Sequence, residues 1–206
     1  MERALKLWFI SQRILAAVLL VVSAPLWIGL AILIRSGSPG KMIVRQDREG
    51  RGGAIFGMFK LRTMHCDADA RLASILADGV AAEEWRRFGR LGSDPRIAGR
   101  FGGLARRYSI DELPQLINVV RGEMALVGPR PLLPQIAIRL QPEDLHARRQ
   151  VAPGLTGLWQ VSGRSDLDLE TMGQIDRDYV KRRSLWLDLS ILLRTLPTVI
   201  FARGAY

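Results

Sequence analysis

The sequence contains a single cysteine, Cys66, and only two histidines among 206 residues. One cysteine excludes an internal disulfide and is typical of a reducing compartment. The segment HCDAD, residues 65–69, mixes side chains that can bind metals, but no second cluster of Cys or His accompanies it. A structural zinc site is therefore not expected, and we interpret Asp67 and Asp69 as the solvated start of a helix.

The sequence has fewer acidic than basic side chains: 20 Asp and Glu compared with 30 Lys and Arg, which gives a formal net charge of +10. This balance favours an anionic partner such as nucleic acid, an anionic lipid surface or a phosphorylated substrate. A nucleic-acid binder should carry a recognition helix, a binding module or aromatic stacking platforms, and none is found, so nucleic acid is not an expected partner. Internal repeats and low-complexity linkers are also absent, and the length predicts one domain, residues 1–206.

Charge is absent altogether from ILAAVLLVVSAPLWIGLAILI, residues 14–34. As a straight helix this segment would rise about 31 Å, close to the roughly 30 Å hydrocarbon core of a bilayer. Pro25 lies near its middle and removes one helical hydrogen bond, which favours a kink. Ser23 could bond to the backbone groups that the proline frees. Together, Ser23 and Pro25 predict a break in a membrane-embedded helix.

Basic residues flank this apolar segment on both sides. They are Arg3, Lys6 and Arg13 before it, and Arg35, Lys41, Arg45 and Arg48 after it. Because positive charge marks the cytoplasmic side of a membrane segment, both ends are predicted to be cytoplasmic. We therefore interpret residues 1–36 as a re-entrant helix, with a simple span as the alternative. A cleaved signal peptide is disfavoured because the apolar region exceeds the usual length of about 7–15 residues.

The remaining residues, 37–206, carry the patterns of two short strands and several helices. The strands are predicted at 42–47 and 54–64, on either side of the glycine-rich turn REGRGG. Helices are predicted at 67–90, at 114–120 with Pro114 in its first position, at 167–183 and in the apolar tail 184–201. Residues 121–134 and 153–166 are predicted as irregular loops. The tail fits either a core helix or one that lies in a membrane interface.

Two adjacent carboxylates, Asp111 and Glu112, occur in SIDELPQL, residues 109–116. Ser109 and Glu112 match the capping box S-x-x-E, while Pro114 offers a rival helix start. Either arrangement places the carboxylates near a helix N-terminus, where anions are stabilised. The functional alternative is that one carboxylate attacks phosphorus or holds a metal while the other transfers a proton.

Arg130 stands between two prolines in GPRP, residues 128–131. A residue before proline favours extended geometry, so this stiff loop would present the guanidinium for bidentate contact with a phosphate. An ordinary proline-rich turn is the alternative. Further arginines occur in ARR, residues 105–107, and SGR, residues 162–164, where plain solvation is the simplest role.

Several segments together resemble one known family. They are FKLRTM, DPRI, SIDELPQLINVVRGEMALVGPRP, PGLTGLWQVSGRS and DYVKRRSLWLDLSILLRT, in this order. The chain resembles the bacterial sugar transferases, the monotopic phosphoglycosyl transferases that begin exopolysaccharide and O-antigen synthesis. The resemblance extends from the apolar segment to about residue 198, and the pair DELPQL and VGPRP is its most specific part.

The resemblance implies an α+β, helix-rich fold with a compact domain on the cytoplasmic face of the bacterial inner membrane, a re-entrant N-terminal helix and interfacial amphipathic helices. It implies that a sugar 1-phosphate moves from a UDP-sugar to undecaprenyl phosphate and that UMP leaves. Anionic membrane lipids would be further partners, and a homodimer is compatible with the family. The segment GLWQVSGR is similar to that of members that use hexoses, which favours galactose or glucose.

The resemblance also assigns roles to residues. Asp111 would attack the β-phosphorus to give an aspartyl phosphosugar, and Glu112 would assist proton removal from the acceptor phosphate. Mg²⁺, or Mn²⁺ in its place, would neutralise the pyrophosphate with Asp111 as a ligand. Arg106, Arg130 and Arg164 would hold substrate phosphates. The alternative is a basic, membrane-anchored binding or scaffold protein without catalysis, which would have little need for such a carboxylate pair.

Overall fold

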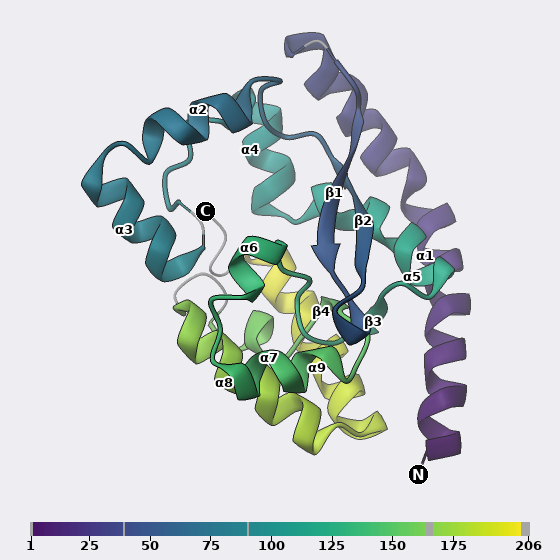
Figure 1. Ribbon diagram of the computed structural model, residues 1–206. Coiled ribbons are helices and arrows are strands. Elements are labelled where there is room, and N and C mark those ends of the chain that lie inside the picture. The colour runs from purple at the N-terminus through teal and green to yellow at the C-terminus, as the bar shows by residue number, and fades with distance from the viewer. Residues whose placement is uncertain (1, 39, 90, 164–166, 203–206) are drawn as a thin grey trace.

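The computed structural model describes residues 2–38, 40–89, 91–163 and 167–202 of the protein. Helices account for most of these residues, and two small sheets complete an α+β, helix-rich fold, as expected from the sequence. Figure 1 shows the long N-terminal helix lying along one side of the other elements.

The elements follow one another in a simple order. The first half of the chain contains α1 (Glu2–Gly37), β1 (Ile43–Glu49), β2 (Ile55–Leu61), α2 (Ala68–Ile75), α3 (Gly79–Phe88) and α4 (Gly99–Arg107). The 3₁₀ helix η2 (Ile110–Gln115), α5 (Leu116–Arg121), β3 (Ala125–Val127), α6 (Pro134–Ala137) and α7 (Pro142–Arg149) come next. The chain then forms β4 (Gly154–Thr156), the 3₁₀ helix η3 (Trp159–Val161), α8 (Leu169–Arg182) and α9 (Leu185–Ile200).

Strands β1 and β2 form the predicted antiparallel hairpin. The register pairs Ile43 with Leu61 at the open end and Glu49 with Ile55 next to the turn. Gly52 in the turn takes a φ of 70°, a left-handed conformation that glycine adopts without strain. The two strand-like segments and the glycine-rich turn between them were therefore sufficient to predict this unit.

Residues 67–90, which were predicted as one helix, form two. Helix α2 ends at Ile75 and α3 begins at Gly79. Asp78 opens the second helix, because its carboxylate accepts a hydrogen bond from the Val80 amide at 2.9 Å. An N-capping aspartate followed by a glycine favours a new helix start over continuation of the first.

The later helices agree more closely with the sequence. Helix α8 occupies the predicted 167–183 region and α9 occupies the apolar tail. Helix α5 begins at Leu116 rather than at Pro114, since Pro114 lies inside η2. The proline is therefore not the first residue of α5, as the sequence had suggested.

Both segments predicted as loops, 121–134 and 153–166, contain a strand of three residues. Strands β3 and β4 pair in parallel, with Ala125 opposite Gly154. Gly154 permits this close approach, because a Cβ added there would lie 2.1 Å from the Gly128 amide nitrogen. Strands this short leave no alternating pattern to detect in a sequence. The pair fixes the point at which the loop that carries Arg130 begins.

Helix α1 continues through Pro25 without a break in its assignment, although Figure 1 shows that its two halves run in different directions. The Ser23 hydroxyl donates to the Leu20 carbonyl at 3.4 Å. The carbonyl that loses its helical donor to Pro25 is that of Val21, so the predicted bond from Ser23 to a freed group is wrong. By length and apolar composition alone, Leu7–Gly37 is long enough to cross a membrane.

The rest of the chain holds α1 at both ends of its apolar stretch. Near the first end, the buried Gln12 accepts a hydrogen bond from the Leu126 amide at 2.7 Å. Near the second end, Leu30 and Ile34 pack with Ala105 in a buried cluster. The residues between these two contacts correspond to about 33 Å of helix. One body of protein therefore lies beside the whole apolar stretch.

A buried carboxylate joins α1 to the C-terminal helices. Asp188, in the first turn of α9, is fully buried. Its two oxygens accept hydrogen bonds from the Trp8 indole and the Tyr179 hydroxyl, both at 2.8 Å. These contacts fix α1 against α8 and α9 before the apolar stretch begins.

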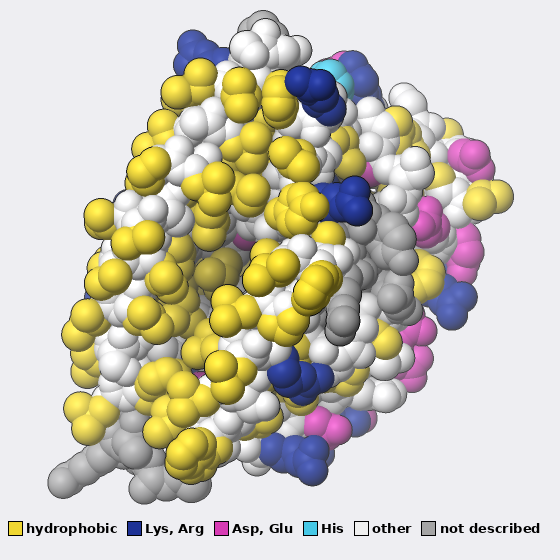
Figure 2. Space-filling model, turned by 180° about the vertical axis from the view of Figure 1, so that it is seen from behind, with side chains coloured by type: hydrophobic (Ala, Val, Ile, Leu, Met, Phe, Trp, Pro, Cys, Tyr) yellow, Lys and Arg dark blue, Asp and Glu magenta, His cyan; other side chains and the backbone are white. Residues whose placement is uncertain are grey.

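The outward faces of α1 and α9 expose apolar side chains. Trp186 and Leu193 of α9 are 79% and 70% exposed. The most exposed apolar side chains of α1 are Leu7, Ile14, Val21 and Val22. Figure 2 shows hydrophobic side chains spread widely over this side of the molecule. Large exposed apolar surfaces mark sites of contact with lipid or with other proteins.

Candidate active site

Asp111 and Glu112 lie side by side on η2, between α4 and α5. Ser109 immediately before them takes a φ of 54°, and its side chain does not cap the helix. The Glu112 amide donates instead to the Ser109 carbonyl at 3.1 Å. The predicted capping box is therefore wrong, because left-handed backbone at Ser109 is not the extended conformation of an N-cap.

Each carboxylate is paired with a different cation. The Lys60 ammonium, from β2, lies 2.9 Å from Asp111 Oδ2 and 4.0 Å from Glu112 Oε1. Arg130 donates both of its terminal nitrogens to Glu112, at 2.6 and 3.2 Å. Asp111 is 2% exposed and Glu112 9% exposed, so neither pair is screened by bulk water. The two adjacent carboxylates thus have different surroundings, which allows them to take different chemical roles.

Burial raises the pKa of Asp111 above its usual range, and the negative charge of Glu112 acts in the same direction. The positive charges of Lys60 and Arg106 oppose this shift and favour the ionised carboxylate. Glu112 in turn raises the pKa of Arg130, so that guanidinium stays charged. The protonation state of Asp111 therefore depends on the cations that surround it.

A cavity of about 800 Å³ opens beside Asp111 and Glu112, which together are called the dyad below. Its cationic lining consists of Arg45, Arg48, Lys60, Arg62, Arg96, Arg106 and Arg130. The lining also includes the aromatic side chains of Trp85 and Trp159. Ligand sites in proteins have volumes of about 300–1,000 Å³, so the space is sufficient for a nucleotide-sized molecule. The concentration of cations favours a ligand that carries several negative charges.

The structure brings most of the sequence-predicted site residues together. Asp111, Glu112 and Arg130 are in contact, and Arg106 lies on the wall of the same cavity at the end of α4. The GPRP loop presents the Arg130 guanidinium to Glu112, and its predicted bidentate contact with a substrate phosphate stays a prediction. Arg164 lies outside the described residues.

Two further cations in the site were not found from the sequence. Lys60 is the one charged residue of β2, next to its last position, and a lysine in an apolar strand is a signal of a charged partner. The second cation is Arg48 on β1, where burial, aided by the charge of Arg130, lowers its pKa to about 10. A guanidinium this close to Arg130 remains protonated at neutral pH and adds to the positive potential of the cavity.

The family model for bacterial sugar transferases matches residues 2–202, nearly the whole chain and all of the site. The chain belongs to the bacterial sugar transferase family. The match confirms the family resemblance that was drawn from the DELPQL and VGPRP segments.

Individual relatives of this chain agree with the family match. An undecaprenyl-phosphate galactose phosphotransferase of Salmonella typhimurium is 41% identical over 91% of this chain and 39% of its own length. A UDP-glucose:undecaprenyl-phosphate glucose-1-phosphate transferase of Caulobacter vibrioides is 42% identical, over 93% of this chain and 68% of its own. The exopolysaccharide production protein ExoY of Sinorhizobium fredii is 38% identical, over 94% and 85%. The chain thus spans less than half of the Salmonella protein but most of ExoY.

Asn118 on α5 holds the strand that carries Lys60. Its side chain is fully buried and accepts a hydrogen bond from the Phe59 amide at 3.0 Å. The Asn118 side-chain nitrogen Nδ2 in turn donates to the Gly57 carbonyl at 2.9 Å. Because these bonds hold the backbone of β2 just before Lys60, they fix the position of the Lys60 ammonium relative to Asp111.

The segment HCDAD forms no metal site in the part of the chain that the structure describes, where no group of three or more His, Cys, Asp and Glu side chains is present. Asp67 forms an ion pair with Arg71 at 2.8 Å on the exposed surface of α2. Asp67 precedes α2 and Asp69 lies in its first turn, in agreement with the predicted helix start.

The raised pKa of Asp111 predicts a pH-dependent loss of stability. Between about pH 4, where an aspartate ionises in an unfolded chain, and the higher pKa of the folded state, the native protein keeps a proton that the unfolded chain has lost. The contribution of Asp111 is therefore fully present below about pH 4 and is lost as the pH rises through the folded pKa. Asparagine does not ionise, so Asp111→Asn avoids this loss. We therefore expect the substitution to change the free energy of unfolding more favourably at pH 7 than at pH 4.

Urea unfolding in detergent micelles at the two pH values measures this difference. Asp47→Asn, at an exposed position of β1, is the control and should change the free energy of unfolding by the same small amount at both. A pH-independent effect of Asp111→Asn would contradict the electrostatic description of the dyad.

Proposed function

We propose that this protein transfers a sugar 1-phosphate from a UDP-sugar to undecaprenyl phosphate and releases UMP. The observation that carries the proposal is the buried dyad: two adjacent carboxylates, each held by its own cation, at the edge of a cavity lined with arginines. The names of the relatives support both substrates, since they specify undecaprenyl phosphate together with galactose or UDP-glucose.

The first step is proposed to be attack by Asp111 on the β-phosphorus of the UDP-sugar. A bond forms between a carboxylate oxygen and phosphorus, the bond from phosphorus to the bridging oxygen breaks, and UMP leaves with that oxygen. Lys60 favours the ionised, nucleophilic form of Asp111. Arg130 and Arg48 lie where they can stabilise negative charge on the phosphoryl oxygens.

In the second step Glu112 would accept a proton from undecaprenyl phosphate, whose oxygen attacks the aspartyl phosphosugar and frees Asp111. The bidentate contact with Arg130 favours ionised Glu112, which a general base requires. The product is a sugar linked to the lipid by a diphosphate. The different surroundings of Asp111 and Glu112 are consistent with one acting as the nucleophile and the other as the base.

The donor set of the site fits Mg²⁺ better than a transition metal. Mg²⁺ is bound in many phosphoryl-transfer sites by one or two carboxylates together with substrate phosphates, and Asp111 offers such a carboxylate beside a cavity suited to phosphates. We propose Asp111 as the protein ligand. When bound, the cation supplies neutralisation of the pyrophosphate charge.

The exposed apolar faces of α1 and α9 are proposed to contact the bacterial inner membrane. The same body of protein packs against both ends of the apolar stretch of α1. A helix that crossed the bilayer would carry this polar body into the lipid, where its charges would be costly. A shallow, re-entrant α1 with both ends on the cytoplasmic side avoids that cost, and the basic residues Arg13 and Arg35 at the two ends favour it.

A basic scaffold without catalysis is the rival proposal. It would explain the net charge and the apolar surface, but it gives no reason to bury Asp111 and Glu112. Buried, paired acids in a cleft are costly and are concentrated at sites of chemistry. The buried dyad therefore favours the enzyme.

The covalent intermediate is the first test of the proposed function. Wild type incubated with UDP-glucose or UDP-galactose but no lipid acceptor should release at most one UMP per enzyme and gain the mass of a hexose phosphate on the peptide that contains Asp111. Asp111→Asn should lose both signals, because an amide does not attack phosphorus. Glu112→Gln should still form the adduct but lose turnover on the order of 10²–10⁴-fold, as is typical of a missing general base.

Asp69→Asn is the matched control, since Asp69 lines the cavity outside the dyad and its variant should retain wild-type turnover. An adduct on Glu112, or one that forms in Asp111→Asn, would reverse the assignment of roles. Release of UMP only when the lipid is present, with no adduct, would indicate a single displacement.

The proposed metal predicts that turnover stops when divalent cations are removed. Excess EDTA should abolish UMP release, and Mg²⁺ or Mn²⁺ should restore it, because the pyrophosphate charge is otherwise not neutralised. Binding of Mn²⁺ in the presence of UDP-sugar, followed by electron paramagnetic resonance, should weaken in Asp111→Asn and remain in Asp69→Asn. Undiminished turnover in EDTA would exclude the metal.

The proposed orientation of α1 predicts that both ends of the chain are protected from the outside of the cell. Single cysteines introduced at position 2 or 206, in a Cys66→Ser background, should not react with a membrane-impermeant maleimide in intact cells. Pro25→Ala should shift part of the population toward a spanning helix, because it restores a hydrogen-bond donor and relieves the kink. Labelling at position 2 alone in the otherwise native chain would show that α1 crosses the membrane.

A further inference from the structure

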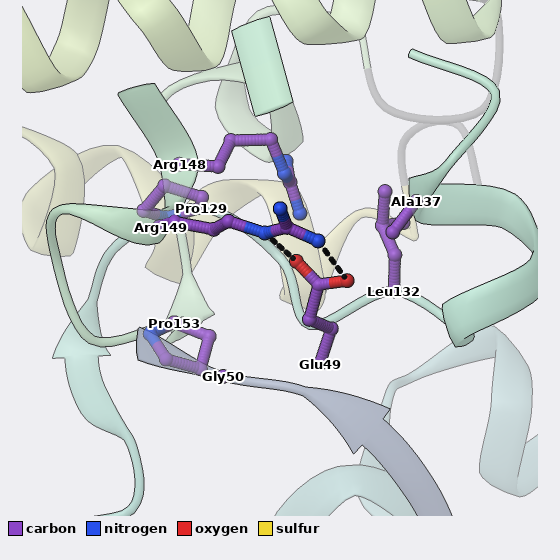
Figure 3. Close-up of a pocket in the computed structure, with 8 residues that line it drawn as sticks. All are labelled: Glu49, Gly50, Pro129, Leu132, Ala137, Arg148, Arg149 and Pro153. Atoms are coloured by element: carbon purple, nitrogen blue, oxygen red, sulfur yellow. Dashed lines mark hydrogen bonds and ion pairs between the residues drawn. The ribbon is translucent and has the colours of Figure 1, made fainter. Parts of the chain in front are cut away.

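Two neighbouring arginines at the end of α7 point to different partners. Arg149 donates to the Glu49 carboxylate at 2.8 and 3.2 Å and is 40% exposed. Arg148 is only 8% exposed. Figure 3 shows the paired side chains of Arg149 and Glu49, and no interaction joins Arg148 to either of them there. The surface pair has an ordinary structural role, whereas the buried arginine needs another explanation.

Arg148 bridges a carboxylate on one side and the backbone of the active-site loop on the other. One terminal nitrogen donates to Asp176 Oδ2 and the other to the carbonyl oxygen of Arg130. Asp176, on α8, is fully buried. The guanidinium thus links α8 to the residue whose own guanidinium holds Glu112.

The loop from Gly128 to Pro134 has few backbone donors of its own, since Pro129, Pro131 and Pro134 lack an N–H. Its start is fixed by the Gly128 amide, which donates to the Thr156 carbonyl at 2.9 Å. Its further part is fixed at the Leu132 carbonyl, which accepts from the Glu49 amide at 2.9 Å. Arg148 acts between these two anchors, at Arg130 itself.

We infer that Arg148, oriented by Asp176, is a positioning residue that sets the direction of the Arg130 guanidinium toward Glu112 and toward the substrate phosphates. The inference rests on the proposed function for the phosphates, but the contact to Glu112 is independent of it. A planar fork can donate to two acceptors in fixed directions, which a lysine at the same place cannot do. The chain of contacts then runs from Asp176 through Arg148 and Arg130 to Glu112.

The rival explanation is that Arg148 merely neutralises Asp176 between α7 and α8. The same interface provides a control for this. Arg177 on α8 lies 3.1 Å from the buried Asp144 and 3.3 Å from Glu143. It joins the same two helices by ion pairs, and both of its carboxylate partners lie on α7. A purely structural role for Arg148 predicts that loss of either arginine has similar consequences.

A double-mutant cycle on Arg148→Met and Arg130→Ala tests the inference, with two readouts. The first is kcat/KM for UMP release, and the second is the affinity for inorganic pyrophosphate measured by calorimetry, which needs no turnover. Arg148→Met should lower kcat/KM by up to about 100-fold, because small displacements of a positioning group have effects of that order. In the Arg130→Ala background the same substitution should cost no more than about twofold, since it acts through a side chain that is already gone.

Conservative replacement and chemical rescue separate positioning from folding. Arg148→Lys keeps the charge beside Asp176 but should recover little activity. Millimolar guanidinium, far below denaturing concentration, should restore part of the activity of Arg148→Ala but not change that of Arg177→Met. Arg177→Met should lower the unfolding temperature as much as Arg148→Met and keep kcat/KM within about twofold of wild type.

Multiplicative losses in both readouts of the cycle, or an equal loss of activity in Arg177→Met, would overturn the positioning role. Failure of the proposed function is recognised separately. If wild type releases no UMP and forms no adduct while the pyrophosphate cycle is still non-additive, Arg148 positions Arg130 in a site with another chemistry.

Discussion

Burial of two adjacent carboxylates on one 3₁₀ turn is the constraint on which the rest of the structure depends. A buried charge costs several kcal/mol unless an opposite charge and hydrogen bonds compensate it. Lys60 forms the closest ion pair of Asp111 and also lies 4.0 Å from Glu112, which Arg130 holds at 2.6 Å. Lys60 comes from β2 and Arg130 from the loop after β3. The fold must therefore hold three distant segments in register before the dyad can exist.

Side chains that do not touch the dyad supply that register. Asn118 holds the backbone of β2 just before Lys60, through hydrogen bonds with the Phe59 amide and the Gly57 carbonyl. Gln12 accepts a hydrogen bond from the Leu126 amide, four residues before Arg130, and so extends the support of the loop into α1. Each of these polar groups is buried and satisfied in at least one bond by the backbone it holds. The helix with the apolar outer face is thus also a structural part of the site.

Local sequence patterns predicted the elements that local forces produce. The β1–β2 hairpin follows from strand-like segments on either side of a glycine-rich turn, and α8 and α9 follow from helix-forming sequence. The parallel pair β3–β4 could not be predicted, because three residues contain no period and the partners meet only through tertiary packing. At Ser109 a capping pattern was present, but the tertiary contacts of the dyad impose left-handed backbone that a pattern does not encode. The family resemblance indicated a role for Asp111 and Glu112, whereas the pairing of Lys60 with Asp111 required the assembled fold.

The packing of α1 also explains how a site can serve two substrates from different phases in the proposed reaction. Leu30 and Ile34 pack on Ala105 of α4, and α4 leads within a few residues into the turn that carries Asp111. The distance from the apolar surface to the nucleophile is therefore set by packed helices rather than by a flexible linker. A linker would let the dyad sample many heights above the lipid, and the entropy of that freedom would have to be lost at each encounter. A rigid connection removes this loss in advance, because the lipid phosphate and the soluble donor then meet at one fixed depth.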